Sequence, residues 1–297
     1  MKIPHLVQYQ GSKRNLAHSI YPYFPKQFDR LIEPFSGTAA ITLLCAYYKN
    51  TDNFIINDLN KPLIELLKLV VNNPKYVADK YEEIWKDQHY DSIEHYYQIR
   101  EKFNLTNDPV LFLYLLARCV KGSVRYNSEG LFNQSPDKRR LGTNPKTMRQ
   151  NIDSVSFLLK NKITFFSSDY KTILEIAQPG DVVYMDPPYQ GVCGERDSRY
   201  FSGINHTEFV SELEKLNYKG ISYLVSYDGI CGDKNYGEKL PDSLNLEHIS
   251  LNAGRSSQAT LLGKDSKTVE SLYVTKDLLF NYMAFVKFEE KNGELFC

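Results

Sequence analysis

The sequence lacks the features that define several protein classes. Five cysteines without a CxxC pair argue against a disulfide framework and against a zinc site. The longest apolar run, residues 110–117, is far too short to span a bilayer, and the N-terminus contains no apolar signal core. We therefore expect a soluble, cytoplasmic protein without a bound metal.

Net charge is absent as well. The 36 basic and 36 acidic residues balance over 297 residues, so bulk charge gives no reason to expect a nucleic-acid partner. Any case for DNA must therefore depend on local clusters. The length suits one large domain or two smaller ones.

One short apolar strand ends in an unusual way. Residues 181–185 run directly into Asp186, Pro187, Pro188 and Tyr189, and two successive prolines cannot continue a strand. Asp186 and the Pro187 carbonyl could accept both N–H bonds of an amino group on a flat ring, while Tyr189 stacks on that ring. A strand and turn without any chemistry is the alternative.

Two earlier strand ends predict a nucleoside pocket. The first predicted strand ends at Glu33, and Phe35 and Gly37 follow in a turn that leads into an apolar helix. The second ends at Asp58, about 20 residues after the glycine turn, where a carboxylate can accept both ribose hydroxyls. The turn is not GxGxxG, so dinucleotide binding is disfavoured.

The middle of the chain shows helical periodicity without strands. Strands resume at residue 163, and the last two, 244–251 and 270–275, are joined by a long polar loop. We therefore predict a discontinuous α/β domain, residues 1–60 and 161–297, interrupted by a helical domain, residues 61–160. Successive helices are expected at 63–71, 74–86, 91–103, 109–121 and from 145 onward.

The end of this helical region is locally basic. Eight basic and two acidic side chains lie between residues 118 and 149. Arg125 and Asn127 are side chains of the types that read guanine and adenine edges, and Lys138, Arg139 and Arg140 could neutralise phosphates. A solvated basic loop is the alternative.

Near the N-terminus, Tyr9 is followed by a Gly-Ser turn and Lys13. A lysine at a helix start can reach a carboxylate or a carbonyl, and Tyr9 can pack on a ring. A solvated turn is the alternative. Together with the Glu-Pro-Phe-x-Gly turn, the helical insertion and Asp-Pro-Pro-Tyr, this segment resembles the adenine N6 DNA methyltransferases of the Dam-like type. The departures are small, because that family often has Trp at the position of Tyr9 and Gly or Ala at those of Ser12 and Ser36.

The resemblance implies a doubly wound, Rossmann-like α/β sheet that binds S-adenosylmethionine (SAM), with a C-terminal antiparallel hairpin. It also implies methyl transfer to N6 of an adenine flipped out of double-stranded DNA, in a Dam-like enzyme or beside a restriction endonuclease. The implied catalytic residues are Asp186, Pro187 and Tyr189. The implied SAM contacts are Tyr9, Lys13, Glu33, Phe35, Gly37, Asp58, Asp169 and Asp186. The implied DNA contacts are Arg125, Asn127, Lys138, Arg139, Arg140 and Arg255.

Three other functions remain open from the motifs. An N4-cytosine methyltransferase shares the amino-group chemistry, although Ser usually leads its motif. A catalytically silent DNA-binding protein could keep the same fold, and a methyltransferase could act on RNA or protein. A C5-cytosine enzyme is disfavoured, because none of the five cysteines follows a proline.

Overall fold

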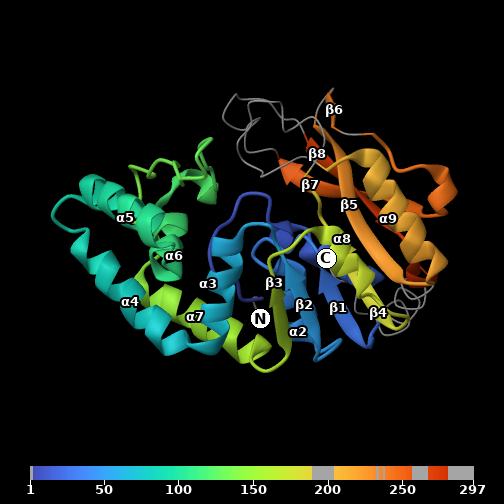
Figure 1. Cartoon of the computed structure of the whole chain (residues 1–297), viewed down its shortest axis with the longest axis horizontal. Helices are drawn as coiled ribbons and strands as arrows, with labels where there is room; N and C mark the ends of the chain where they lie inside the picture. The colour runs from blue at the N-terminus through green and yellow to red at the C-terminus, as the bar shows by residue number, and fades with distance from the viewer. Residues whose placement is uncertain (1–2, 189–203, 232–233, 237, 256–266, 280–297) are drawn as a thin grey trace.

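The fold is organised around one mixed sheet. A computed structural model describes residues 3–188, 204–231, 234–236, 238–255 and 267–279 (Figure 1). Its strands lie in the order β3-β2-β1-β4-β5-β8-β7, and β6 pairs with β5. The bounds are β1 Arg30–Glu33, β2 Phe54–Asn57, β3 Ile163–Phe166, β4 Asp181–Met185, β5 Ser222–Cys231, β6 Lys234–Tyr236, β7 Glu247–Arg255 and β8 Lys267–Val274.

The first five strands, β1 to β5, pair in parallel. Every residue of β2 and β4 is buried, as expected for parallel strands that are covered on both faces. The strand order reverses between β1 and β4, since β2 and β3 lie on one side of β1 and β5 lies beyond β4. Ligands of such sheets bind at the carboxyl ends of the strands beside this reversal.

The predicted C-terminal antiparallel pair is present, with different limits. β7 and β8 pair antiparallel, and β8 also pairs antiparallel with β5, so it lies between them. The pairing of β5 with β8 shifts register between Ser226 and Gly229, where two residues of β5 oppose one residue of β8. Such a β-bulge bends the strand and redirects nearby side chains.

Helices cover both faces of the sheet. Alternate residues of β4 belong to two cores, with Val182 and Tyr184 in one and Val183 and Met185 in the other. The second core holds α8 and α9, and the first holds the remaining helices. The helix bounds are α1 Ala17–Ile20, α2 Ala40–Tyr48, α3 Lys61–Asn72, α4 Pro74–Asp87, α5 Ser92–Thr106, α6 Pro109–Arg118, α7 Pro145–Leu159, α8 Tyr170–Glu175 and α9 His206–Tyr218.

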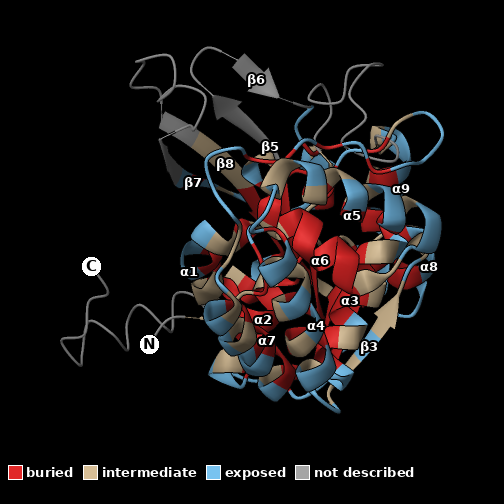
Figure 2. Ribbon diagram, turned by 90° about the vertical axis from the view of Figure 1, so that its left-hand side faces the viewer, coloured by how far each residue is buried: buried red, intermediate tan, exposed pale blue. Residues whose placement is uncertain are grey.

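Helices α4 to α6 form a lobe on the side of α3 (Figure 1). α6 is buried continuously from Val110 to Leu116 and contacts α3, α4 and α5, so the first core extends from the sheet into the lobe (Figure 2). α6 ends at Arg118, three residues before the predicted end, because Cys119 is extended. None of the described helices is long and apolar enough to cross a membrane.

Candidate active site

A cavity of about 320 Å³ lies at the carboxyl ends of β1, β2 and β4. Its walls come from the N-terminal segment, the turns after these strands, and the loop that follows α6. Tyr189 lies outside the described residues. The cavity brings together nine of the residues predicted for catalysis or SAM binding: Tyr9, Lys13, Glu33, Phe35, Gly37, Asp58, Asp169, Asp186 and Pro187.

Glu33 ends β1 at the base of the cavity and is almost fully buried. Its Oε2 accepts hydrogen bonds from the main-chain N–H of Thr42, at 2.9 Å, and from the Thr42 hydroxyl. Burial raises the pKa of Glu33 to about 8 against these two bonds, and the negative charge of Asp186 adds to the rise. Glu33 therefore keeps its proton at neutral pH.

The glycine turn and Asp58 form one unit. Gly37 has a left-handed φ of 49°, and its N–H donates to Oδ2 of Asp58 at 3.0 Å. The N–H of Asn60 donates to Oδ1 of Asp58 at 2.8 Å. Burial raises the pKa of Asp58, and these two bonds oppose the rise. The carboxylate is thereby fixed beside the turn, with lone pairs left for further donors.

Asn57, which sequence reasoning missed, joins the ends of three chain segments. Its Nδ2 donates to the carbonyls of Pro34 and Ser168, both at 2.9 Å, and its Oδ1 accepts from the N–H of Ser168 at 2.8 Å. The side chain is buried. The only sequence signal is a polar residue that ends an otherwise apolar strand.

The other side of the cavity carries an aromatic face and a carboxylate. Phe35 is half-buried, and its ring centroid lies 5.1 Å from that of Tyr170. Asp169 is exposed and caps α8, since its Oδ1 accepts from the N–H of Lys171 at 2.9 Å. Its second oxygen can face a ligand in the cavity.

Lys13 connects the N-terminal segment to the end of β4. Its Nζ lies 2.8 Å from Oδ1 of Asp186 and 3.2 Å from Oε2 of Glu270, and its side chain is 8% exposed. Burial raises the pKa of Asp186 to about 6, Lys13 opposes the rise, and Glu270 adds to it. Asp186 is therefore mostly ionised at neutral pH. Glu270 was not predicted.

The loop after α6 forms part of the cavity wall through Tyr126. The buried Tyr126 hydroxyl donates to Oδ1 of Asn60 at 3.1 Å, so the loop is joined to the turn that holds Asp58. The N–H of Gln10 donates to the carbonyl of Gly122 at 3.0 Å, which joins the same loop to the N-terminal segment. These two bonds position the loop beside the cavity.

Two predicted DNA contacts, Arg125 and Asn127, lie on this loop in different environments. Arg125 is exposed. The Oδ1 of Asn127 accepts from the main-chain N–H groups of Glu129 and Leu131, at 3.0 and 2.9 Å. Bidentate reading of adenine by Asn127 would compete with these bonds. Arg255 ends β7, and its side chain lies outside the described part of the chain.

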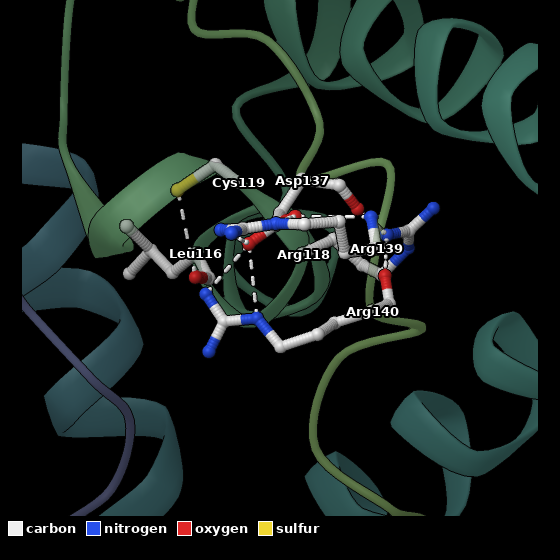
Figure 3. Close-up of polar contacts among 6 residues, drawn as sticks. All are labelled: Leu116, Arg118, Cys119, Asp137, Arg139 and Arg140. Carbon is white, nitrogen blue, oxygen red and sulfur yellow. Dashed lines mark hydrogen bonds and ion pairs between the residues drawn. The ribbon is translucent and has the colours of Figure 1, made fainter. Parts of the chain in front are cut away.

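The buried guanidinium of Arg118 hydrogen-bonds to the backbone at both ends of the basic segment, residues 138–140 (Figure 3). Arg118 is 1% exposed and donates to the main-chain carbonyls of Asp137, Ser92 and Arg140. Arg139 and Arg140 lie 3.1 and 2.7 Å from the Asp137 carboxylate, and their hydrogen bonds hold the pKa of Asp137 well below its usual range.

This arrangement leaves Arg139 and Arg140 accessible. Their side chains are 83% and 56% exposed, although Asp137 offsets part of their charge. Lys138 is exposed as well. The segment therefore presents cations on a fixed backbone, outside the cavity described above.

The sequence is similar to those of known DNA methyltransferases. The model of the D12 class N6 adenine-specific DNA methyltransferase family matches residues 9–256. The Type II methyltransferase M1.LlaDCHI of Lactococcus lactis subsp. cremoris is 25% identical, over 90% of this chain and 94% of its own. The Retron Ec67 DNA adenine methylase of Escherichia coli is 26% identical, over 86% and 88%. The DNA adenine methylase of Serratia marcescens is 32% identical, over 62% and 66%.

Proposed function

Because the chain belongs to the D12 class N6 adenine-specific DNA methyltransferase family, we propose that its cavity binds SAM and a flipped-out adenine together. The family membership confirms the predicted resemblance and the predicted class of enzyme, an adenine-specific DNA methyltransferase. It also removes the support for N4-cytosine as the target. SAM supplies the methyl group in this chemistry.

The residues of the cavity fit such a donor. We assign the ribose hydroxyls to Asp58, whose carboxylate is fixed by two main-chain amides but keeps further acceptor capacity. The half-buried ring of Phe35 offers an apolar surface, and Asp169 is placed to accept from an amino group. Glu33 and the Gly37 turn are assigned to the amino-acid end, with Tyr9 and Lys13 beside them in the cavity wall.

Asp186 is assigned to bind the amino group of the target adenine. Lys13 binds its Oδ1, so within the described chain Oδ2 is the oxygen that faces an incoming amino group. Asp186 and the Pro187 carbonyl accept the two N6–H bonds, which favours a pyramidal nitrogen with an available lone pair. Tyr189 is assigned to stacking on the extruded adenine, and removal from the duplex costs a few kcal/mol.

The single observation that supports this assignment most strongly is the location of Asp186. It follows β4 at the strand-order reversal, in the same cavity as the glycine turn and Asp58, with 18% of its side chain exposed. A carboxylate needed only for packing would not have to border a cavity that the glycine turn and Asp58 also line.

DNA recognition is assigned to the helical segment 61–160 and to the hairpin loop. Arg125, Lys138, Arg139 and Arg140 are exposed and suited to phosphates or base edges, and Arg255 is assigned to the same surface. Asn127 reads a base only if its intraloop bonds open. A restriction endonuclease partner stays a prediction that the name of the Lactococcus lactis relative supports.

The test is methyl transfer from labelled SAM to DNA, followed by digestion and identification of the modified nucleoside. The wild type should yield N6-methyladenine, and Asp186→Ala should reduce turnover by at least about a hundredfold. Asp153→Ala, an equal change on the exposed face of α7, is the control. Retained turnover in Asp186→Ala would remove this residue from catalysis, and SAM binding without turnover in the wild type would indicate a silent DNA-binding protein. Methyl transfer to RNA or protein instead of DNA would change the assigned substrate.

A further inference from the structure

The acidic side chain of Glu270 lies in an unexpected place. Glu270 belongs to β8, where it pairs with Gly229 of β5 and Leu251 of β7, so it is interior to the sheet. Leu272 and Val274 lie on the same face of β8 and are fully buried in the first core. An acidic residue in phase with these two would be costly without a partner.

Strand alternation explains how Glu270 and Asp186 come together. Asp186 is in phase with Val182 and Tyr184 of β4, whose side chains belong to the same core as Leu272. Both carboxylates therefore lie on one face of the sheet, the face that the N-terminal segment covers. The β-bulge of β5 lies directly beside Glu270 and redirects side chains at this end of the sheet.

One ammonium serves both carboxylates. Lys13 lies 2.8 Å from Asp186 and 3.2 Å from Glu270, and only 21% of the Glu270 side chain is exposed. The charged groups that face Asp186 among the described residues are Lys13 of the N-terminal segment, Glu270 of β8 and Glu33 of β1. Glu33 keeps its proton at neutral pH, so the cluster then carries one net negative charge.

We propose that Glu270 is a positioning residue for methyl transfer, which pairs with Lys13 and thereby stops Lys13 from fully neutralising Asp186. The negative charge of Glu270 offsets part of the positive potential that Lys13 produces at Asp186. Asp186 thereby stays a stronger acceptor for the N6 amino group than an isolated Lys–Asp pair would provide. Glu270 acts through Lys13 and does not contact the base, and this inference depends on the proposed function of Asp186.

The charge balance predicts the direction in which a variant should differ. In Glu270→Gln, Lys13 no longer pairs with a second carboxylate, and a negative charge near Asp186 is lost. Both changes favour the ionised form of Asp186. The acid limb of kcat/KM should therefore move to lower pH, by roughly half a unit to one unit.

The experiment measures the pH profile of kcat/KM for DNA methylation in the wild type and in three variants. Glu270→Gln should show the downward shift, and Glu270→Asp, which keeps the charge, should have a smaller one. Glu247→Gln is the matched control, because it removes the same charge from an exposed position of β7, and its limb should stay at the wild-type position. If Glu270→Gln does not fold, Glu270→Thr removes the charge with a residue suited to strands.

The outcomes separate this inference from the proposed function. An acid limb that stays in place in Glu270→Gln, or moves upward because Lys13 is displaced, would overturn the positioning role. A wild-type protein that transfers no methyl group to adenine would instead remove the proposed function itself. A shift of equal size in Glu247→Gln would show that general charge is responsible, and would also overturn the inference.

Discussion

Replacing Glu33 with glutamine should reduce the dependence of stability on pH. Glu33 is 2% exposed, and burial raises its pKa to about 8 from an ordinary value of 4.5. Between these two values the folded protein holds a proton that the unfolded chain releases. The free energy of unfolding of the wild type therefore falls as pH rises through this window.

The size of the effect follows from the shift in pKa. One proton released on unfolding lowers the free energy of unfolding by ~1.4 kcal/mol per pH unit. From about pH 6 to about pH 8, Glu33 should therefore lower the free energy of unfolding of the wild type by ~2 to 3 kcal/mol. The pKa of Asp186 is about 6, so most of its own contribution lies below this range, and it is present in both proteins.

Urea unfolding at the two pH values measures this difference. The glutamine side chain keeps an oxygen that can accept from the Thr42 N–H, so Glu33→Gln should fold. The free energy of unfolding of Glu33→Gln minus that of the wild type should be ~2 to 3 kcal/mol larger at the higher pH than at the lower pH. Glu101→Gln, on the exposed surface of α5, controls for the loss of one carboxylate.

Parallel pH dependences of the wild type and Glu33→Gln would refute the reasoning. They would mean that the pKa of Glu33 is the same in the folded and unfolded states, although its side chain is buried in the folded protein. The assignment of a neutral Glu33 at the base of the cavity would then be wrong. A flattened curve in Glu101→Gln as well would point to the net charge of the protein instead.

Three further variants test other parts of the structure. Asp58→Asn should weaken SAM binding about tenfold or more, because a neutral oxygen is a poorer acceptor, and calorimetry showing affinity within twofold would contradict this. Gly122→Ala should lower the free energy of unfolding by ~2 kcal/mol, because its Cβ would lie 2.2 Å from the Gln8 carbonyl oxygen at a φ of 61°. An unchanged urea midpoint would argue otherwise. Arg118→Met should cost ~3 kcal/mol or more, since it leaves buried carbonyls such as that of Asp137 without donors, and a preserved Tm would count against that role.

The parts of the fold that follow from local pattern were predictable from the sequence. Short apolar runs that lead into Glu33, Asp58 and Asp186 indicated parallel strands, and polar residues at their carboxyl ends meet at one edge of a sheet. The predicted site residues at these ends line one cavity for this reason. The helices between β2 and β3 also followed from their periodicity and from caps such as Asp108.

The parts that depend on long-range pairing could not be predicted. Nothing in the sequence of β8 states that it lies between β5 and β7, so the pairing of Glu270 with Lys13 was hidden. The hydrogen bonds of Asn127 within its own loop could not be predicted either. Its residue type suits adenine, but the loop conformation uses its oxygen for two main-chain amides.

The bridge from Lys13 to Asp186 and Glu270 has a consequence for biosynthesis. The ribosome adds Lys13 long before Glu270, so a long stretch of polypeptide separates the cation from its second anion. Until β8 has been translated and inserted beside β5, the nascent protein lacks the ion pair between Lys13 and Glu270. Contacts this distant along the chain form slowly. Competence for methylation should therefore be among the last properties that a newly made molecule acquires.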